Sequence, residues 1–149
     1  MARTIFDSAH RDELLDRLNR LTPDAEARWG QMTAPRMICH LSDSLRVASG
    51  EIPAEFKRSP LANPIVRWLM AYVVPFPKEK AQTAPEMLLT QPADWQTDLS
   101  TVRDQLRAAA QRGPNGKWAP HPAFGDISGV LYGVFIYKHF DHHLRQFGV

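Results

Sequence analysis

The stretch DISGVLYGVFIYKHFDHHLRQFG, residues 126–148, decides the fold. It contains no proline, and its large apolar side chains recur at helical spacing on one arc, formed by Tyr132, Phe135, Ile136, Phe140 and Phe147. Such spacing predicts a long amphipathic helix that buries this arc in a core. We expect the helix to begin near Asp126 or Ser128, both good N-cap residues, and to reach the residue before Gly148.

Helical geometry also sorts the histidines of this stretch by direction, because successive side chains of a helix are about 100° apart. His139 and His143 fall near the centre of the apolar arc, whereas His142 falls at its edge, toward the charged side chains Lys138 and Arg145. Residues four apart share one face of a helix, one turn from each other. The sequence therefore predicts two imidazoles directed into the core at neighbouring levels.

Prolines divide the rest of the chain into segments. There are twelve of them, and long helices must lie in the gaps because proline lacks the amide proton and clashes with the preceding turn. The gaps predict four elements ahead of the last helix, at about residues 8–20, 33–50, 65–74 and 94–111. We therefore predict an all-α fold, a four-helix bundle, in a single domain, 1–149. A short extra helix lies in its proline-rich insert, 50–92, between the second and third long helices.

A third histidine is expected to face the same core. His40 lies on the apolar side of the predicted second helix, between Met37 and Val47, and Cys39 falls on the opposite, polar side. Three converging imidazoles suit zinc, nickel, copper or iron, and three protein ligands leave a position for water or substrate. The alternative is that these are core histidines held by ordinary hydrogen bonds. Burying three imidazoles without a metal, however, leaves several polar nitrogens to satisfy.

Four further polar groups lie near this predicted site. Gln146 shares the face of His139 and either supports a ligand or makes a hydrogen bond at the helix end; Tyr132 either lines the pocket mouth or is ordinary core. Asp43 is three residues from His40 but leans outward, so we expect it to be solvated. His121, in the loop before the last helix, is a candidate acid/base group, with capping or surface roles as the alternative. No catalytic residue is otherwise assigned.

Composition excludes several classes of protein. The formal charge is +2 over 149 residues, and the basic residues are scattered, so no electrostatic surface for nucleic acid is expected. The longest apolar stretch, 68–76, is too short to span a membrane, and no secretory signal opens the chain. A single cysteine fits a reducing compartment, so a cytoplasmic location is expected. The chain shows no Ser-His-Asp order, phosphate loop or dinucleotide fingerprint.

Two motifs resemble those of the DinB/YfiT-like superfamily: HFDHHLRQ at 139–146 and MTAPRMICHL at 32–41, which contains His40. The WG pair at 29–30 and the HPAFG loop at 121–125 resemble a DUF1569-type branch of that superfamily. The resemblance implies a four-helix bundle that holds a divalent metal ion, with ligands corresponding to His40, His139 and His143 and with His142 as a non-ligand. It also implies a homodimer. Known relatives include thiol-dependent transferases and isomerases and metal-dependent hydrolases.

Three functions remain open at this point. The first is a metal-dependent hydrolase or low-molecular-weight-thiol transferase that uses zinc or nickel at the three-histidine site and acts on a small-molecule substrate. The second is a non-catalytic, stress-associated bundle that binds a metal or a small ligand. The third is a helical interaction module whose partner face is the apolar segment 65–74. We expect that segment to pack against the bundle, because an exposed patch with Trp68 and Tyr72 would be unusual.

Overall fold

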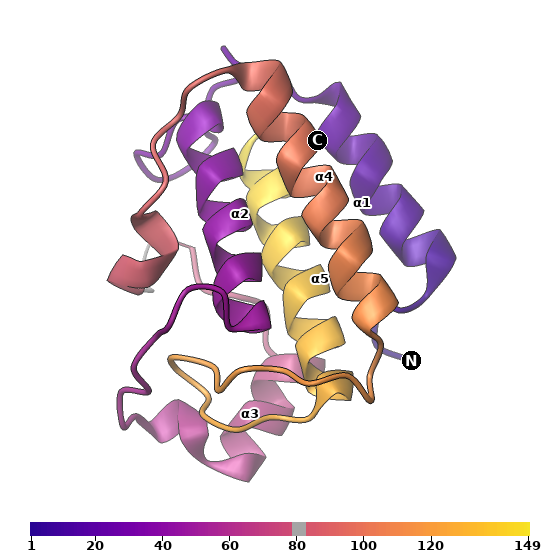
Figure 1. The fold of residues 1–149 in the computed structure, drawn as a ribbon, viewed down its shortest axis with the longest axis vertical. Helices are drawn as coiled ribbons and strands as arrows, with labels where there is room; N and C mark the ends of the chain where they lie inside the picture. Colours follow the sequence, from indigo (N-terminus) through magenta and orange to yellow (C-terminus); the bar gives the residue numbers. More distant parts are fainter. Residues whose placement is uncertain (79–82) are drawn as a thin grey trace.

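The computed structural model describes residues 1–78 and 83–149, and this part of the chain is all-helical (Figure 1). It contains five α-helices and no strand, apart from an isolated bridge between His121 and Gly125. The elements are α1 (Ser8–Arg20), α2 (Ala34–Ser49), η1 (Pro60–Ala62), α3 (Pro64–Tyr72), η2 (Pro85–Leu88), α4 (Trp95–Arg112) and α5 (Gly129–Gln146), where η marks a 3-10 helix. The predicted all-α class is confirmed.

Capping residues fix where the long helices begin. The side chain of the N-cap residue accepts a hydrogen bond from a backbone amide of the first turn in each of them, at Asp7, Thr33, Asp94 and Ser128. This contact satisfies one of the amides that a helix N-terminus leaves without a partner. α2 ends at Gly50, which adopts the left-handed conformation with φ of 82° and donates its amide to the carbonyls of Arg46 and Val47.

The four long helices share one hydrophobic core, an arrangement that fits a four-helix bundle. Fully buried side chains come from every one of them, among them Leu14, Leu41, Leu106 and Phe140. α5 packs against α1 and α2, and α4 packs against α2, as the four neighbouring helices in Figure 1 allow the reader to follow. The N-terminal segment crosses α5 at Gly133, whose carbonyl accepts the amide of Ile5 at 3.2 Å.

The insert 50–92 adds α3 at one end of the bundle. A second apolar cluster connects it to α5, with Ala71, Phe124, Val134 and Phe135 as its buried members. The outer face of α3 is nevertheless open, since the exposed fraction of Trp68 is 55% and that of Tyr72 is 41%. The expected packing of this segment against the bundle is confirmed for the side of α3 that carries Ala71, but the expectation that Trp68 and Tyr72 would be covered is wrong.

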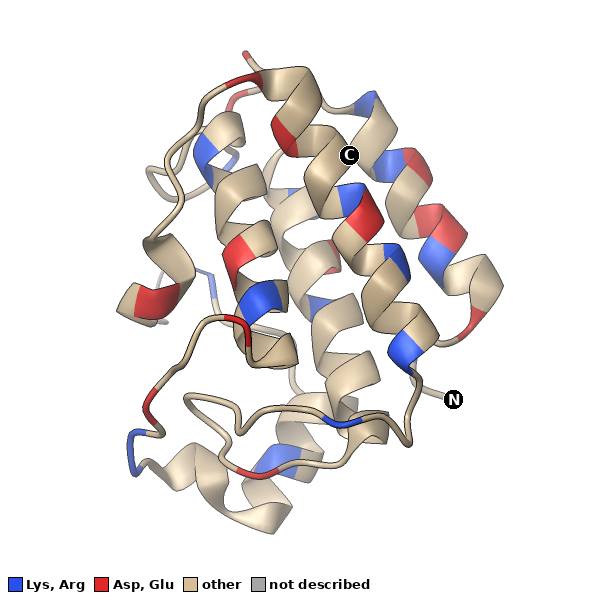
Figure 2. Cartoon of the chain, in the orientation of Figure 1, with Lys and Arg blue, Asp and Glu red and all other residues tan. Residues whose placement is uncertain are grey.

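Charged side chains of both signs are mixed on the visible surface. Figure 2 shows blue and red positions interspersed along α1 and α4, with no single-sign stripe in this view. Within the described ranges, 1–78 and 83–149, none of the helices has the length and apolar character needed to cross a membrane.

Candidate metal centre

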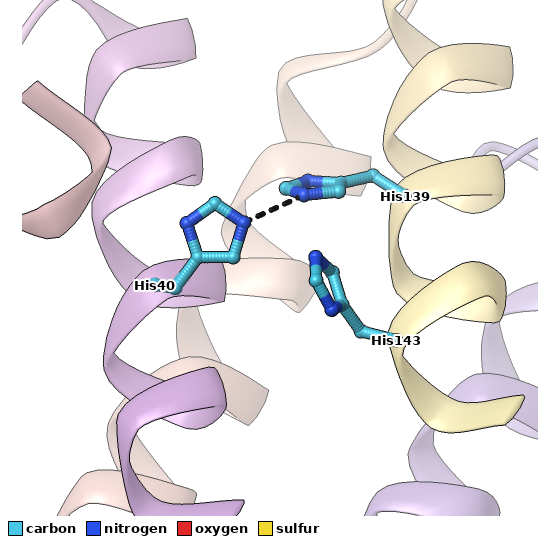
Figure 3. Close-up of side chains that lie close together, drawn as sticks. All are labelled: His40, His139 and His143. Carbon is cyan, nitrogen blue, oxygen red and sulfur yellow. Dashed lines mark hydrogen bonds between the residues drawn. The ribbon is translucent and has the colours of Figure 1, made fainter. Parts of the chain in front are cut away.

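Three histidines meet between α2 and α5 (Figure 3). His40 projects from α2, and His139 and His143 project from successive turns of α5, as their spacing predicts. The Nε2 atoms of His40 and His139 are 2.8 Å apart, and one ring nitrogen from each histidine lies within 4.8 Å of the others. In the part of the chain that the structure describes, this is the cluster of potential ligand residues close enough to share one ion.

Hydrogen bonds fix how two of these rings are turned. The Nδ1 atom of His40 lies 2.9 Å from the carbonyl oxygen of Met87, so the ring donates Nδ1–H and keeps the lone pair on Nε2. The Nδ1 atom of His143 lies 2.8 Å from Oε1 of Gln146, whose Nε2 donates to the carbonyl of Trp29 at 2.8 Å. In both rings the Nε2 lone pair is therefore available to a metal ion.

Burial keeps these imidazoles neutral. Desolvation lowers the pKa of His40, and it lowers the pKa of His139 well below the usual range, with the neighbouring histidines adding to the effect. For His143, desolvation and the proximity of His40 lower the pKa to about 3. A metal ion binds the neutral ring, so no proton must leave before coordination near pH 7. The three residues thus fit a divalent ion in their geometry, donor type and protonation state.

The neighbouring His142 takes a different direction from His143. Its ring is half-buried and makes edge contacts with Trp29 and Phe76, at centroid distances of 5.6 and 6.1 Å. It is not a member of the converging cluster, in agreement with its place at the edge of the apolar arc.

Cys39 is also outside the cluster, but its surroundings differ from those expected. It is 2% exposed, so the side of α2 that the sequence marks as polar is covered at this position. Burial raises the pKa of the Cys39 thiol to about 11. A thiol that stays protonated near neutral pH is a poor metal ligand.

The exposure of Asp43 differs most from the prediction. Its side chain is 0% exposed, where the sequence predicted a solvated carboxylate. Its oxygens accept the backbone amide of Thr90 at 2.7 Å and the Thr90 hydroxyl at 2.5 Å. The segment around η2, which the sequence left without a role, covers the side of α2 that carries this carboxylate. Met87, which holds the His40 ring, belongs to the same segment.

The structure distinguishes between the two roles that the sequence left open for Gln146 and for Tyr132. The side-chain oxygen of Gln146 accepts a hydrogen bond from the His143 ring, which favours its supporting role over a simple hydrogen bond at the helix end. Tyr132 is 2% exposed and donates its hydroxyl to the carbonyl of Ala119 at 2.6 Å, so it is a core residue that fastens the loop before α5.

His121 lies in that loop, outside the three-histidine cluster. Its Nδ1 accepts the backbone amides of Ala123 and Phe124 at 3.1 and 3.3 Å, and its ring packs beside Phe135, one turn before His139. Because burial lowers the pKa of His121 to about 4, the ring is neutral near pH 7 and carries its proton on Nε2. Its role as an acid/base group stays a prediction.

The fold and the site together define a class: an all-helical protein with a cluster of three histidines, between two helices, that could hold a metal ion. The family follows from comparison with family models. The model described as "Protein of unknown function (DUF1569)" matches residues 4–148, so the chain belongs to the DUF1569 family. Comparisons with curated proteins and with solved structures gave no match.

Proposed function

We propose that this protein is a DinB-like four-helix bundle that binds one divalent metal ion, zinc or nickel, through His40, His139 and His143. One observation carries the proposal: ring nitrogens from two helices lie within 4.8 Å of one another. The Nδ1 acceptors of two of the rings, Met87 and Gln146, leave their Nε2 lone pairs directed into the cluster. A histidine with a purely structural role in a core needs a hydrogen-bond partner, but it does not need two further histidines within this distance.

The proposed activity is that of a metal-dependent hydrolase or a low-molecular-weight-thiol transferase acting on a small-molecule substrate. Three protein ligands are typical of catalytic rather than structural zinc, because they leave one coordination position open. An ion held there supplies Lewis-acid chemistry to a water, a thiol or a substrate oxygen. The chain's own contribution is to hold three neutral rings in fixed orientations and to keep their pKa values low.

Location and assembly belong to the same proposal. We propose a cytoplasmic homodimer, on the basis of the single cysteine and of the resemblance to DinB-like proteins. The open apolar face of α3, with Trp68 and Tyr72, supports an association of this kind, although a different partner would fit the same chemistry. Neither nucleic acid nor a membrane is part of the proposal.

A non-catalytic metal- or ligand-binding bundle is the second candidate, and one observation favours it. The cluster consists of histidines alone within the described residues, and the nearby carboxylate of Asp43 is occupied by Thr90. A hydrolase of this type would have no carboxylate base beside its ion. In this second function the ion would carry a fourth ligand that does not exchange.

Metal analysis of the untagged protein tests the binding step. We expect about one zinc or nickel ion per chain in the wild type and none in the His139→Ala/His143→Ala variant. His142→Ala is the matched control, since it removes an adjacent histidine that lies outside the cluster, and it should keep its metal. A wild-type protein without metal after reconstitution, or a control that loses it, would contradict the proposed site.

Binding of a small anion to the metal then separates the two candidate functions. The Co²⁺-loaded protein is titrated with azide while its visible absorption spectrum is recorded. An open position in the coordination sphere predicts a spectral change that saturates with azide, as the enzyme requires. An unchanged spectrum at high azide would favour the non-catalytic bundle.

A further inference from the structure

The segment that follows α3 in the insert contacts α2 in a way that bears on the metal site. We call residues 85–90, which begin with η2, the η2 segment. The guanidinium of Arg36 donates to the carbonyls of Leu88 and Thr90, both at 2.9 Å. Thr90 in turn donates its amide and its hydroxyl to the two carboxylate oxygens of Asp43. The η2 segment is therefore docked on α2 by four hydrogen bonds that involve charged groups.

The Asp43 carboxylate requires this docking. A carboxylate with no exposed area loses its hydration, and that loss is tolerated only where hydrogen-bond donors replace the water. Thr90 supplies two donors, at 2.7 and 2.5 Å, and the guanidinium of Arg46 lies farther away at 3.4 Å. Undocking the η2 segment would thus leave the carboxylate without its two shortest hydrogen bonds, so Asp43 strongly favours the docked arrangement.

The docked η2 segment also determines the orientation of a metal ligand. Met87 lies three residues before Thr90, and its carbonyl is the acceptor for Nδ1 of His40 at 2.9 Å. Without this acceptor the His40 ring could turn or exchange its tautomer, and Nε2 would then no longer face His139 reliably. The charge of Asp43 acts on His40 directly, but its hydrogen bonds reach the ring through Thr90 and then the Met87 carbonyl.

From these contacts we propose that Asp43 and Thr90 are positioning residues that couple docking of the η2 segment to metal binding at His40. The proposal rests on the metal site proposed above. Docking presents the Met87 carbonyl and so raises metal affinity. By thermodynamic reciprocity, a bound ion stabilises the docked segment by the same factor. Metal binding and docking of the η2 segment are therefore coupled, and each one favours the other.

Zinc affinity of four proteins tests the coupling: the wild type, Thr90→Val, Thr90→Ser and Thr101→Val. Thr90→Val removes the hydroxyl that Asp43 accepts, whereas Thr90→Ser keeps it. Thr101→Val is the matched control, since this threonine lies on the exposed side of α4 and donates its hydroxyl to the Thr97 carbonyl of the same helix. We expect Thr90→Val to weaken zinc binding about 10- to 100-fold, and the other two variants to stay within about threefold of the wild type.

A second measurement needs no variant, and it distinguishes an effect on docking of the η2 segment from an effect on the stability of the bundle. Hydrogen exchange of the Thr90 amide, whose acceptor is Asp43, is followed in the wild-type protein with and without zinc. Coupling predicts slower exchange of this amide in the zinc-loaded protein, by a factor similar to the loss of affinity in Thr90→Val. The thermal stability of each metal-free variant shows whether the bundle itself is intact.

The outcomes are distinct. Wild-type zinc affinity in Thr90→Val, or exchange of the Thr90 amide that zinc leaves unchanged, would overturn the coupling while the metal site stands. A wild-type protein that binds neither zinc nor nickel would overturn the metal site and the coupling with it. Weakened zinc binding in Thr90→Val, with Thr90→Ser close to the wild type and zinc-dependent protection of Thr90, supports the coupling.

Discussion

The Nε2 atoms of His40 and His139 face each other at 2.8 Å, a distance at which two bare lone pairs would repel. His40 donates its own proton from Nδ1 to Met87, so the proton between the two rings belongs to His139. A tetrahedral zinc ion with nitrogens at about 2.0–2.1 Å places its ligand atoms about 3.3 Å apart. Metal binding would therefore require His139 to carry its proton on Nδ1 instead of Nε2, and the two facing nitrogens to separate by about 0.5 Å.

This relationship predicts the tautomers of the three histidines. In the metal-free protein, His40 and His143 should carry their proton on Nδ1, and His139 should carry it on Nε2. Zinc should move only the His139 proton, to Nδ1, because its Nε2 becomes a ligand. Long-range ¹H–¹⁵N spectra of the histidine rings report these states directly. A His40 ring protonated on Nε2 before zinc is added would contradict this interpretation of the site.

Gln146 should contribute to metal affinity although it is not one of the three histidine ligands. Its amide connects Nδ1 of His143 to the carbonyl of Trp29, so Gln146→Ala removes the acceptor that orients the His143 ring. We expect zinc binding to weaken about 10- to 100-fold, measured by competition with a chelator.

Gln111→Ala, on the exposed end of α4, is the matched control for that substitution. It removes the same side chain from a surface position and should leave zinc affinity unchanged. An equal loss in both variants would show that the effect comes from general destabilisation rather than from orientation of His143.

Much of the fold follows from local rules that the sequence displays. Asp7, Thr33 and Ser128 cap helices where capping preferences place them, and Gly50 ends α2 as expected. The direction of His139 and His143 follows from the apolar arc of a single helix. These features depend on neighbours within one or two turns, so the amino-acid order alone is enough to predict them.

The surroundings of α2 could not be predicted in the same way. A scheme with one apolar and one polar face assigns Cys39 and Asp43 to solvent, yet both are buried. The η2 segment covers the Asp43 side of α2, and no local signal marks that segment as its neighbour. The predicted burial of the apolar face of α3 was wrong for the same reason. Burial there depends on whether another element of the fold packs against it, which the sequence of α3 does not determine.

Stability of the metal-free protein should fall as the pH is lowered from about 7.5 to 5. Burial depresses the pKa of His121 to about 4 and that of His143 to about 3, whereas an unfolded histidine titrates near 6.5. Between these values the unfolded chain binds more protons than the folded one, so the free energy of unfolding rises with pH and is lost on acidification. We expect a loss of at least about 2 kcal/mol over this interval.

Urea unfolding in the presence of a chelator, repeated across this pH interval, measures the effect. His121→Phe removes one of the buried titrating groups and should make the loss smaller. The aspartates with lowered pKa, Asp7, Asp24 and Asp94, titrate below this interval and do not compensate. Stability that stays constant from pH 7.5 to 5 would be inconsistent with neutral, buried histidines.

Arg17 should stabilise the bundle without affecting the metal site. Its guanidinium donates to Asp141 at 2.7 Å and to the carbonyl of Val149 at 3.0 Å, which joins α1 to α5 and to the end of the chain. The side chains of Arg17 and Asp141 are only 9% and 21% exposed, so solvent screens their interaction weakly. We expect Arg17→Met to lower the free energy of unfolding by about 2–3 kcal/mol in urea titrations.

Arg107→Met is the control for this prediction, because Arg107 pairs with Asp104 where the two side chains are 51% and 73% exposed. Loss of so exposed a pair should change stability by no more than about 0.5 kcal/mol. Although Asp141 lies between His139 and His143 in the sequence, its carboxylate is held by Arg17 and Arg145 and is not part of the histidine cluster. Zinc affinity should therefore be the same in Arg17→Met as in the wild type, and a decrease would mean that the position of α1 controls the ligands on α5.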